Sequence, residues 1–337
     1  MHIAITASAL CITVYGILAI FIFFLLMSVL AAFIMFRTAV CRKRPTASET
    51  NASGKSFGKA ESYCAKIFRE ASERLMAEPS EIYVLTSRDG LNLRAHYIPH
   101  AASLRSNEPE FILLGMHGYR SNAYKEFGIY ADFYRYKLRA DMMLPDQRAH
   151  GESEGKYICY GVKERYDLLD WIDLTNRISE RKYGRRLPIY VHGISMGCAT
   201  ALMSCGLGFP SNVKGMIADC GYTSPGDIFR HILKNAYHLP GFPFLFLSER
   251  ITKRTAGFRF NEASTVKSLE SAREDIPILF IHGGGDDFVP TCMTRENYSA
   301  YNGEKKLLII EGAGHAKSYY ENTAAYEAAV TELVSNS

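Results

Sequence analysis

The sequence predicts an α/β fold, built on a mostly parallel β-sheet with helices on both faces. Its first signal is an Asp89-Gly90 turn between the alternating segments 82–86 and 91–98, the pattern of an antiparallel β-hairpin. Short, nearly unbroken apolar runs follow at 111–114, 142–144, 189–191, 216–218, 278–281 and 307–310. Strands buried on both faces need such runs. Helical periodicity separates the runs, and this alternation is typical of a parallel sheet.

Helices are expected at two further places and a cap at a third. One helix should cover 61–77, ahead of the hairpin, and another should end near Gly184. The apolar positions along one face of the second helix are Val162, Tyr166, Leu169 and Ile172. From 222 to 265 the alternation gives way to a stretch rich in phenylalanine that carries Pro240 and Pro243. We expect this stretch to form a small helical cap over the C-terminal edge of the sheet.

The N-terminal segment has the composition of a membrane-spanning helix. No charged side chain occurs between Ile3 and Phe36, and about 20 apolar residues suffice to cross a bilayer. A cleaved signal peptide is the alternative, but it would have a basic start and a shorter apolar run. The basic residues that follow are Arg37, Arg42, Lys43 and Arg44. They predict a single-pass anchor whose C-terminal side stays in the cytoplasm.

These patterns divide the chain into an anchor with its basic flank at 1–44, a polar linker at 45–60 and one folded domain at 61–337. With 47% hydrophobic and 22% charged residues, the 337-residue chain can form a large core. The net charge of +4 is modest, so no nucleic-acid partner is expected. Eight cysteines show no paired spacing. They are expected to be reduced and mostly buried, in a reducing compartment.

A candidate nucleophile lies where the run 189–191 leads into Gly193-Ile194-Ser195-Met196-Gly197. A strand, a serine flanked by glycines and a helix-forming stretch together predict a nucleophile elbow, whose tight turn tolerates only small residues two positions from the serine. A serine hydroxyl is a weak nucleophile at neutral pH. It therefore needs a base, and a carboxylate that orients the base.

Two later segments supply these groups. Asp286 follows the run 278–281 in a glycine-rich loop, and His315 follows the run 307–310. The chain order Ser195, Asp286, His315 is that of α/β-hydrolases. Asp219, after the run 216–218, is an alternative acid that ranks second.

The remaining candidates are oxyanion donors and structural histidines. The backbone N–H of Met196, and that of Tyr119 in the loop after the run 111–114, are the expected oxyanion donors. Four other histidines lie beside motif glycines and are expected to be hydrogen-bonded structural residues: His117, His150, His192 and His282. No two of them have ligand spacing, so neither a metal nor a cofactor is expected. Asp146 is expected to brace the turn after its strand.

From about Glu81 to the C-terminus the sequence resembles the α/β-hydrolase superfamily, and within it the serine aminopeptidase-like and cinnamoyl-esterase-like hydrolases. The matching segments are 117–119, 146–153, 193–197, 282–290 and 314–315, in the family's order. The resemblance implies that Ser195, Asp286 and His315 form a catalytic triad, with Tyr119 and Met196 as oxyanion donors. Ala149 departs from the family, which often has glycine there; this affects a structural turn.

Three functions follow as alternatives. The first is hydrolysis of a small-molecule or lipid-like carboxylic ester through an acyl-enzyme, with an apolar or aromatic acyl group suited to the cap. The second is a serine aminopeptidase or amidase, or a thioesterase. An aminopeptidase would need acidic groups for the substrate's ammonium, and the cap region offers only Asp227, Glu249 and Glu262. The third is an inactive membrane-tethered binding module, but no triad member is missing from the sequence.

Overall fold

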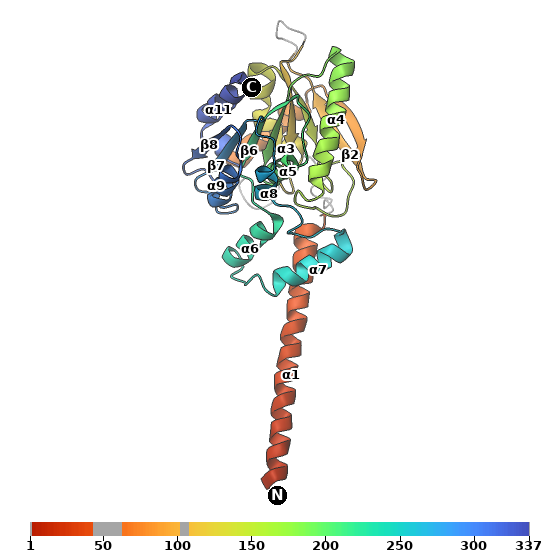
Figure 1. Ribbon diagram of the computed structural model, residues 1–337, viewed down its shortest axis with the longest axis vertical. Helices are drawn as coiled ribbons and strands as arrows, with labels where there is room; N and C mark the ends of the chain where they lie inside the picture. Colours follow the sequence, from red (N-terminus) through yellow and green to blue (C-terminus); the bar gives the residue numbers. More distant parts are fainter. Residues whose placement is uncertain (1, 43–62, 102–107, 337) are drawn as a thin grey trace. The chain divides into compact units, whose positions relative to one another are not determined.

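The structure is a computed structural model that describes residues 2–42, 63–101 and 108–336 (Figure 1). Contacts divide the chain into two compact units. We name them after the roles that the sequence predicts: the anchor unit consists of 1–41 with 229–259, and the hydrolase unit of 42–228 with 260–337. The predicted polar linker, 45–60, lies outside the described residues.

An eight-stranded sheet forms the centre of the hydrolase unit. Its strands are β1 (Glu81–Thr86), β2 (Asn92–Ile98), β3 (Phe111–Met116), β4 (Ala140–Pro145), β5 (Ile189–Ile194), β6 (Val213–Asp219), β7 (Ile278–Gly283) and β8 (Lys305–Ile310). Their order is β1-β2-β4-β3-β5-β6-β7-β8. β1 and β2 pair antiparallel, as does β2 with β4, and the pairs from β4 to β8 are parallel. The predicted hairpin and the six predicted strands are confirmed.

Helices cover both faces of this sheet, as predicted. One face packs against α4 (Glu164–Tyr183), α5 (Met196–Cys205) and α8 (Thr265–Glu270), with α9 (Thr291–Ala300) at its edge. The other packs against α2 (Tyr63–Met76), α3 (Ala123–Phe127), the short helical turns η2 (Gly128–Tyr130) and η3 (Phe133–Lys137), α10 (Ser318–Glu321) and α11 (Thr323–Asn336). Alternate residues of one strand enter the two cores. Ile112 and Leu114 point to the first, and Phe111 and Leu113 to the second.

The buried face of α4 is rotated from the predicted one. Leu168, Trp171 and Ile172 lie in the core, whereas Tyr166 and Leu169 are only half-buried at its edge. The helix ends as expected, at a left-handed Gly184. The rotation brings polar residues of the first turn into the interior.

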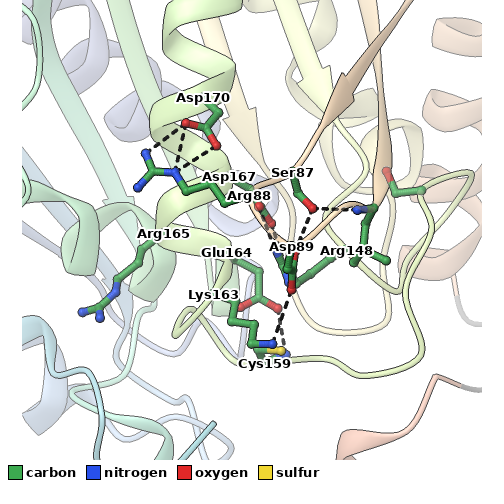
Figure 2. Close-up of polar contacts among 12 residues, drawn as sticks. Ser87, Arg88, Asp89, Arg148, Cys159, Lys163, Glu164, Arg165, Asp167 and Asp170 are labelled. Atoms are coloured by element: carbon green, nitrogen blue, oxygen red, sulfur yellow. Dashed lines mark hydrogen bonds and ion pairs between the residues drawn. The ribbon is translucent and has the colours of Figure 1, made fainter. Parts of the chain in front are cut away.

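A buried ion-pair cluster explains the rotation (Figure 2). The Arg148 guanidinium donates to both carboxylate oxygens of Asp167, at 2.7 and 2.6 Å, and to those of Asp89, at 2.9 and 3.2 Å. Burial opposes the charge on Arg148, but its hydrogen bonds to Asp167 outweigh burial and hold the pKa of Arg148 above its ordinary value. Glu164 accepts from the backbone N–H groups of Cys159 and Gly161. The cluster joins the hairpin turn, the 146–153 segment and α4.

The anchor unit contains one long apolar helix. α1 (His2–Met35) continues into a π-helical turn, η1 (Phe36–Val40). The stretch Thr13–Val40 is 28 residues long and contains an 18-residue window with a mean hydropathy of 3.1, enough by length and composition to cross a membrane. The rest of this unit comprises the last part of α6 (Pro225–Asn235) and α7 (Phe244–Ala256), and α7 contacts α1.

Candidate active site

Ser195 occupies the sharp turn between β5 and α5. Its backbone is left-handed, with φ 54° and ψ −113°, which is uncommon for a residue with a side chain. A Cβ on Gly197 would lie 1.9 Å from the Met116 carbonyl oxygen, and one on Gly193 would lie 2.5 Å from the Gly197 carbonyl oxygen. Glycine is therefore required at both positions, as the motif predicted. The Ser195 N–H donates to the Asp219 carbonyl at 2.9 Å, which fixes the turn against β6.

The structure brings the three predicted catalytic residues together. The Nε2 atom of His315 lies 2.9 Å from Oγ of Ser195, and its Nδ1 atom lies 2.7 Å from Oδ2 of Asp286. The serine and the histidine are 120 residues apart in sequence, and the histidine and the aspartate 29. The His315 side chain remains 24% exposed, so a substrate has access to the ring.

Asp286 is fixed in a fully buried position by four hydrogen-bond partners. Its Oδ1 accepts from the backbone N–H groups of Phe288 and Val289, both at 2.9 Å. Its Oδ2 lies between His315 and Nε2 of His282, which is 3.1 Å away. Burial opposes ionisation, but the bonds from His282 and His315 outweigh it and hold the pKa of Asp286 below its ordinary value. The carboxylate is therefore ionised across the physiological pH range.

His282 supports Asp286. Its Nε2 lies 2.9 Å from the Val289 carbonyl oxygen, an atom that can only accept, so Nε2 carries the proton. The hydroxyl of Thr294 lies 2.6 Å from Nδ1. His282 is thus a hydrogen-bonded structural residue, as predicted. It holds the loop 283–289, which carries Asp286, in place.

The two residues predicted as oxyanion donors belong to segments next to the serine. Met196 is the first residue of α5, and Tyr119 follows β3 in a loop whose Gly118 would place a Cβ 3.5 Å from Cβ of Ser195. Glu126 holds this loop by accepting from the Gly118 N–H at 3.0 Å. The ring of Tyr119 stacks on Tyr160 with centroids 5.3 Å apart. The loop after β3 therefore carries one ring of an aromatic pair.

The 146–153 segment is hydrogen-bonded to that loop. Asp146 accepts from the backbone N–H groups of Ala123 and Glu152, so it braces the turn as predicted. His150 accepts from the Arg120 N–H through Nε2, at 3.0 Å, and burial lowers the pKa of His150 to about 3. Ala149 has φ 62°, a conformation that favours glycine.

Arg42 also contacts this segment, which the sequence did not reveal. Its guanidinium donates to the carbonyls of Ser153 at 2.5 Å and Gly151 at 2.6 Å, and its backbone N–H donates to the Lys156 carbonyl at 2.9 Å. The sequence placed Arg42 in a basic flank that sets membrane topology. The structure adds an intramolecular contact for it within the hydrolase unit.

Asp219 does not contact His315 by a hydrogen bond among the described residues. It ends a buried chain instead: its Oδ2 accepts from the Tyr326 hydroxyl at 3.0 Å, that hydroxyl lies 3.0 Å from Nε2 of His192, and Nδ1 of His192 lies 3.0 Å from the Tyr134 hydroxyl. Burial raises the pKa of Asp219 to about 6 and lowers that of His192 to about 3. Tyr326, on α11, was missed because no local pattern marks it.

Cys220 adds a thiol beside the triad. Ligand atoms of Cys220, Asp286 and His315 lie within 4.8 Å of one another. Asp286 and His315 already hydrogen-bond to each other through these atoms. Burial raises the pKa of the Cys220 thiol well above its ordinary value. A metal bound there would take His315 from Asp286, so these contacts fit a proton-handling site better than a metal site. The seven cysteines whose side chains the structure describes are free thiols.

No protein-family model matches the sequence. Uncharacterized protein YqkD of Bacillus subtilis is 30% identical over 258 residues, which are 75% of this chain and 79% of that protein.

Solved structures of hydrolases share the fold. The Pyrococcus furiosus esterase Pf2001 superposes with a TM-score of 0.58 at 19% identity, over 82% of this chain and 96% of the esterase. The α/β-hydrolase GrgF from Penicillium sp. gives 0.54 at 17% identity, over 77% and 98%. The Pyrococcus horikoshii acylaminoacyl peptidase gives 0.54 at 15% identity, over 82% of this chain and 43% of the peptidase.

Proposed function

Because the chain belongs to the α/β-hydrolase superfamily, in one family with YqkD of Bacillus subtilis, we propose that it is a serine hydrolase that cleaves a carboxylic ester. The observation that carries the proposal is the continuous hydrogen-bonded arrangement of Ser195, His315 and Asp286, with contacts of 2.9 and 2.7 Å. This is the geometry that activates a serine hydroxyl.

The proposed reaction has two halves. Oγ of Ser195 attacks the ester carbonyl carbon while Nε2 of His315 takes its proton, and the N–H groups of Tyr119 and Met196 stabilise the oxyanion. The imidazolium then protonates the departing alkoxide, which leaves an acyl-enzyme. A water molecule, deprotonated by His315, attacks the acyl carbon, and Ser195 regains its proton as the acid leaves. Asp286 stabilises the imidazolium in both halves.

Side chains near the triad favour an apolar acyl group. The Phe288 ring lies 5.0 Å from the His315 ring and is partly exposed, and Tyr119, the proposed oxyanion donor, stacks on Tyr160. Apolar and aromatic surface with few polar groups is typical of sites for such ligands. An aminopeptidase or amidase, or a thioesterase, would use the same triad. The ester is preferred because an esterase, Pf2001 of Pyrococcus furiosus, is among the solved structures that share the fold.

We also propose that Thr13–Val40 crosses the membrane once and leaves the hydrolase unit in the cytoplasm. The length and hydropathy of this helix support the span. The basic residues after it support the orientation.

A fluorophosphonate probe tests the proposal, since it reacts with an activated serine. We expect the full chain to be labelled, Ser195→Ala to lose labelling and turnover, and Ser271→Ala, at an exposed serine, to keep both. A panel of esters with acyl chains of increasing length then identifies the preferred substrate. An unlabelled native chain without turnover would favour the binding module, and full turnover by Ser195→Ala would exclude the proposed nucleophile.

A further inference from the structure

Helix α7 carries two opposite faces within the anchor unit. Ser248, Thr252 and Ala256 recur every fourth residue and are buried. α7 contacts both α1 and η1, where Ala32, Phe36 and Val40 recur with the same spacing and are also buried. Small residues at such spacing let two helices approach closely. Figure 1 shows α7 crossing α1 near its C-terminal end.

The opposite face of α7 is aromatic and basic. Phe246, Arg250, Lys253 and Arg254 are exposed and follow the spacing i, i+4, i+7, i+8, which places them on one side of the helix. The Arg250 guanidinium lies over the Phe246 ring, 4.7 Å from its centroid. This face is therefore directed away from the face that contains Ser248, Thr252 and Ala256.

Further exposed aromatic rings occur in the segment that precedes α7. The ring of Phe242 lies 6.1 Å from that of Phe246. Phe242 is 75% exposed, Tyr237 66% and Phe246 45%, although large aromatic residues normally avoid water. We call Tyr237, Phe242, Phe246, Arg250, Lys253 and Arg254 the aromatic-basic surface.

The charged residues of the segment 229–259 are mostly basic. Between 229 and 259 the basic residues are Arg230, Lys234, Arg250, Lys253, Arg254 and Arg259, and all six are exposed. Glu249 is the acidic residue of this segment. Aromatic rings that sit at the boundary of headgroups and acyl chains, together with basic side chains that reach lipid phosphates, are the features of an interfacial helix.

We propose that the aromatic-basic surface binds the bilayer, with its rings among the acyl-chain ends and its cations on anionic headgroups. The inference rests on the proposed membrane span, because α7 contacts the last turns of that helix, where a spanning helix leaves the hydrocarbon. Charge complementarity favours the cytoplasmic leaflet, whose anionic lipids attract basic segments. The anchor unit then holds the bilayer at two sites, the span and α7.

Tryptophan fluorescence in the full chain tests this proposal. The chain has a single tryptophan, Trp171, which is 1% exposed in the hydrolase unit and gives a constant background. Phe246→Trp reports on the aromatic-basic surface. Phe23→Trp reports on the span, and Tyr136→Trp, at an exposed aromatic of the hydrolase unit, is the matched control. Each protein is reconstituted in phosphatidylcholine–phosphatidylserine vesicles, with and without bromine on the acyl chains.

We expect brominated lipid to quench the added indoles at positions 23 and 246, and not the one at 136. Lys253→Glu with Arg254→Glu should reduce quenching of Phe246→Trp, whereas Arg177→Glu with Arg181→Glu, on α4, should leave it unchanged. Quenching at 23 without quenching at 246 overturns the inference and keeps the span. Absence of quenching at 23 overturns the membrane span together with this inference. Fluorophosphonate labelling of Ser195 tests the proposed hydrolase activity independently of both.

Discussion

The Asp286 carboxylate lies 2.7 Å from Nδ1 of His315 and is wholly buried. Its second oxygen is held by the backbone N–H groups of Phe288 and Val289, so the carboxylate cannot rotate away from the imidazole. This fixes which tautomer His315 adopts: Nδ1 carries the proton, and Nε2 is free to accept one from Ser195.

Asp286→Asn should therefore lower kcat by about 10⁴, the cost of losing the orienting carboxylate in a serine protease. Asp287 is exposed and Asp219 bonds to Tyr326, so the corresponding Asn variants should lose far less. Steady-state ester hydrolysis by the three variants decides between them. If Asp219→Asn shows the large loss of kcat instead, the triad acid lies at the end of β6 and the assignment of Asp286 is wrong.

Of the two glycines in the elbow, Gly197 has the least room for an added side chain. Because an added Cβ would meet the Met116 carbonyl at 1.9 Å, Gly197→Ala should displace β3 or α5, lower the free energy of unfolding by about 3 kcal/mol or more, and abolish fluorophosphonate labelling. Gly184→Ala is the control, since Gly184 has φ 68° but open space around it, and should cost about 1–2 kcal/mol. Thermal unfolding measures both. Equal losses would mean that the elbow relaxes easily.

The sequence was sufficient for those parts of the site that depend on local pattern. The apolar runs predicted the strands, because a strand buried on both faces has no polar positions. The glycines around Ser195 predicted the elbow, because only a missing Cβ fits there. Asp286 and His315 each follow a strand, and parallel strands bring their C-terminal ends to one edge.

The sequence pattern could not predict polar contacts between residues that are far apart in the chain. The buried face of α4 depends on Arg148, which is 19 residues from Asp167 and 59 from Asp89. Tyr326 reaches Asp219 across 107 residues. Hydrophobic periodicity treats such charged and hydroxyl groups as exposed, so it misplaces a helix face on which they are paired and buried.

The raised pKa of Asp219 predicts a pH-dependent cost to stability. An unfolded aspartate has a pKa near 3.9, and in the folded protein the pKa is about 6. The folded state thus binds the proton more tightly, so the Asp219 contribution to stability falls as pH rises from about 4 to 6 and is constant above.

Asp219→Asn cannot ionise and should escape this loss. Its free energy of unfolding relative to the native chain should rise by up to about 3 kcal/mol between pH 4 and pH 7. Asp132→Asn, at an exposed position, should show no such trend. Urea unfolding at several pH values measures the difference. A difference that is independent of pH would mean that the pKa of Asp219 is the same in the folded and the unfolded protein.

Membrane orientation is tested with intact cells. If the basic residues after Val40 stay in the cytoplasm, protease added outside should leave the hydrolase unit whole, and detergent should make it sensitive. A periplasmic or extracellular control protein, digested in the same sample, shows that the protease is active. Digestion of the hydrolase unit in intact cells would reverse the orientation and place the aromatic-basic surface on the outer leaflet.

The contacts of Arg42 predict how far the N-terminus can be shortened. Two charged hydrogen bonds to Gly151 and Ser153 hold the segment that carries His150. A chain beginning at Ser56 should leave membranes on carbonate washing and keep fluorophosphonate labelling. It should be less stable than a chain beginning at Arg42 by about 1–3 kcal/mol. Arg42→Ala in the longer chain should reproduce that loss in thermal unfolding, and Arg37→Ala in the full chain should not. Equal stability of both shortened chains would show that Arg42 contributes nothing to the hydrolase unit.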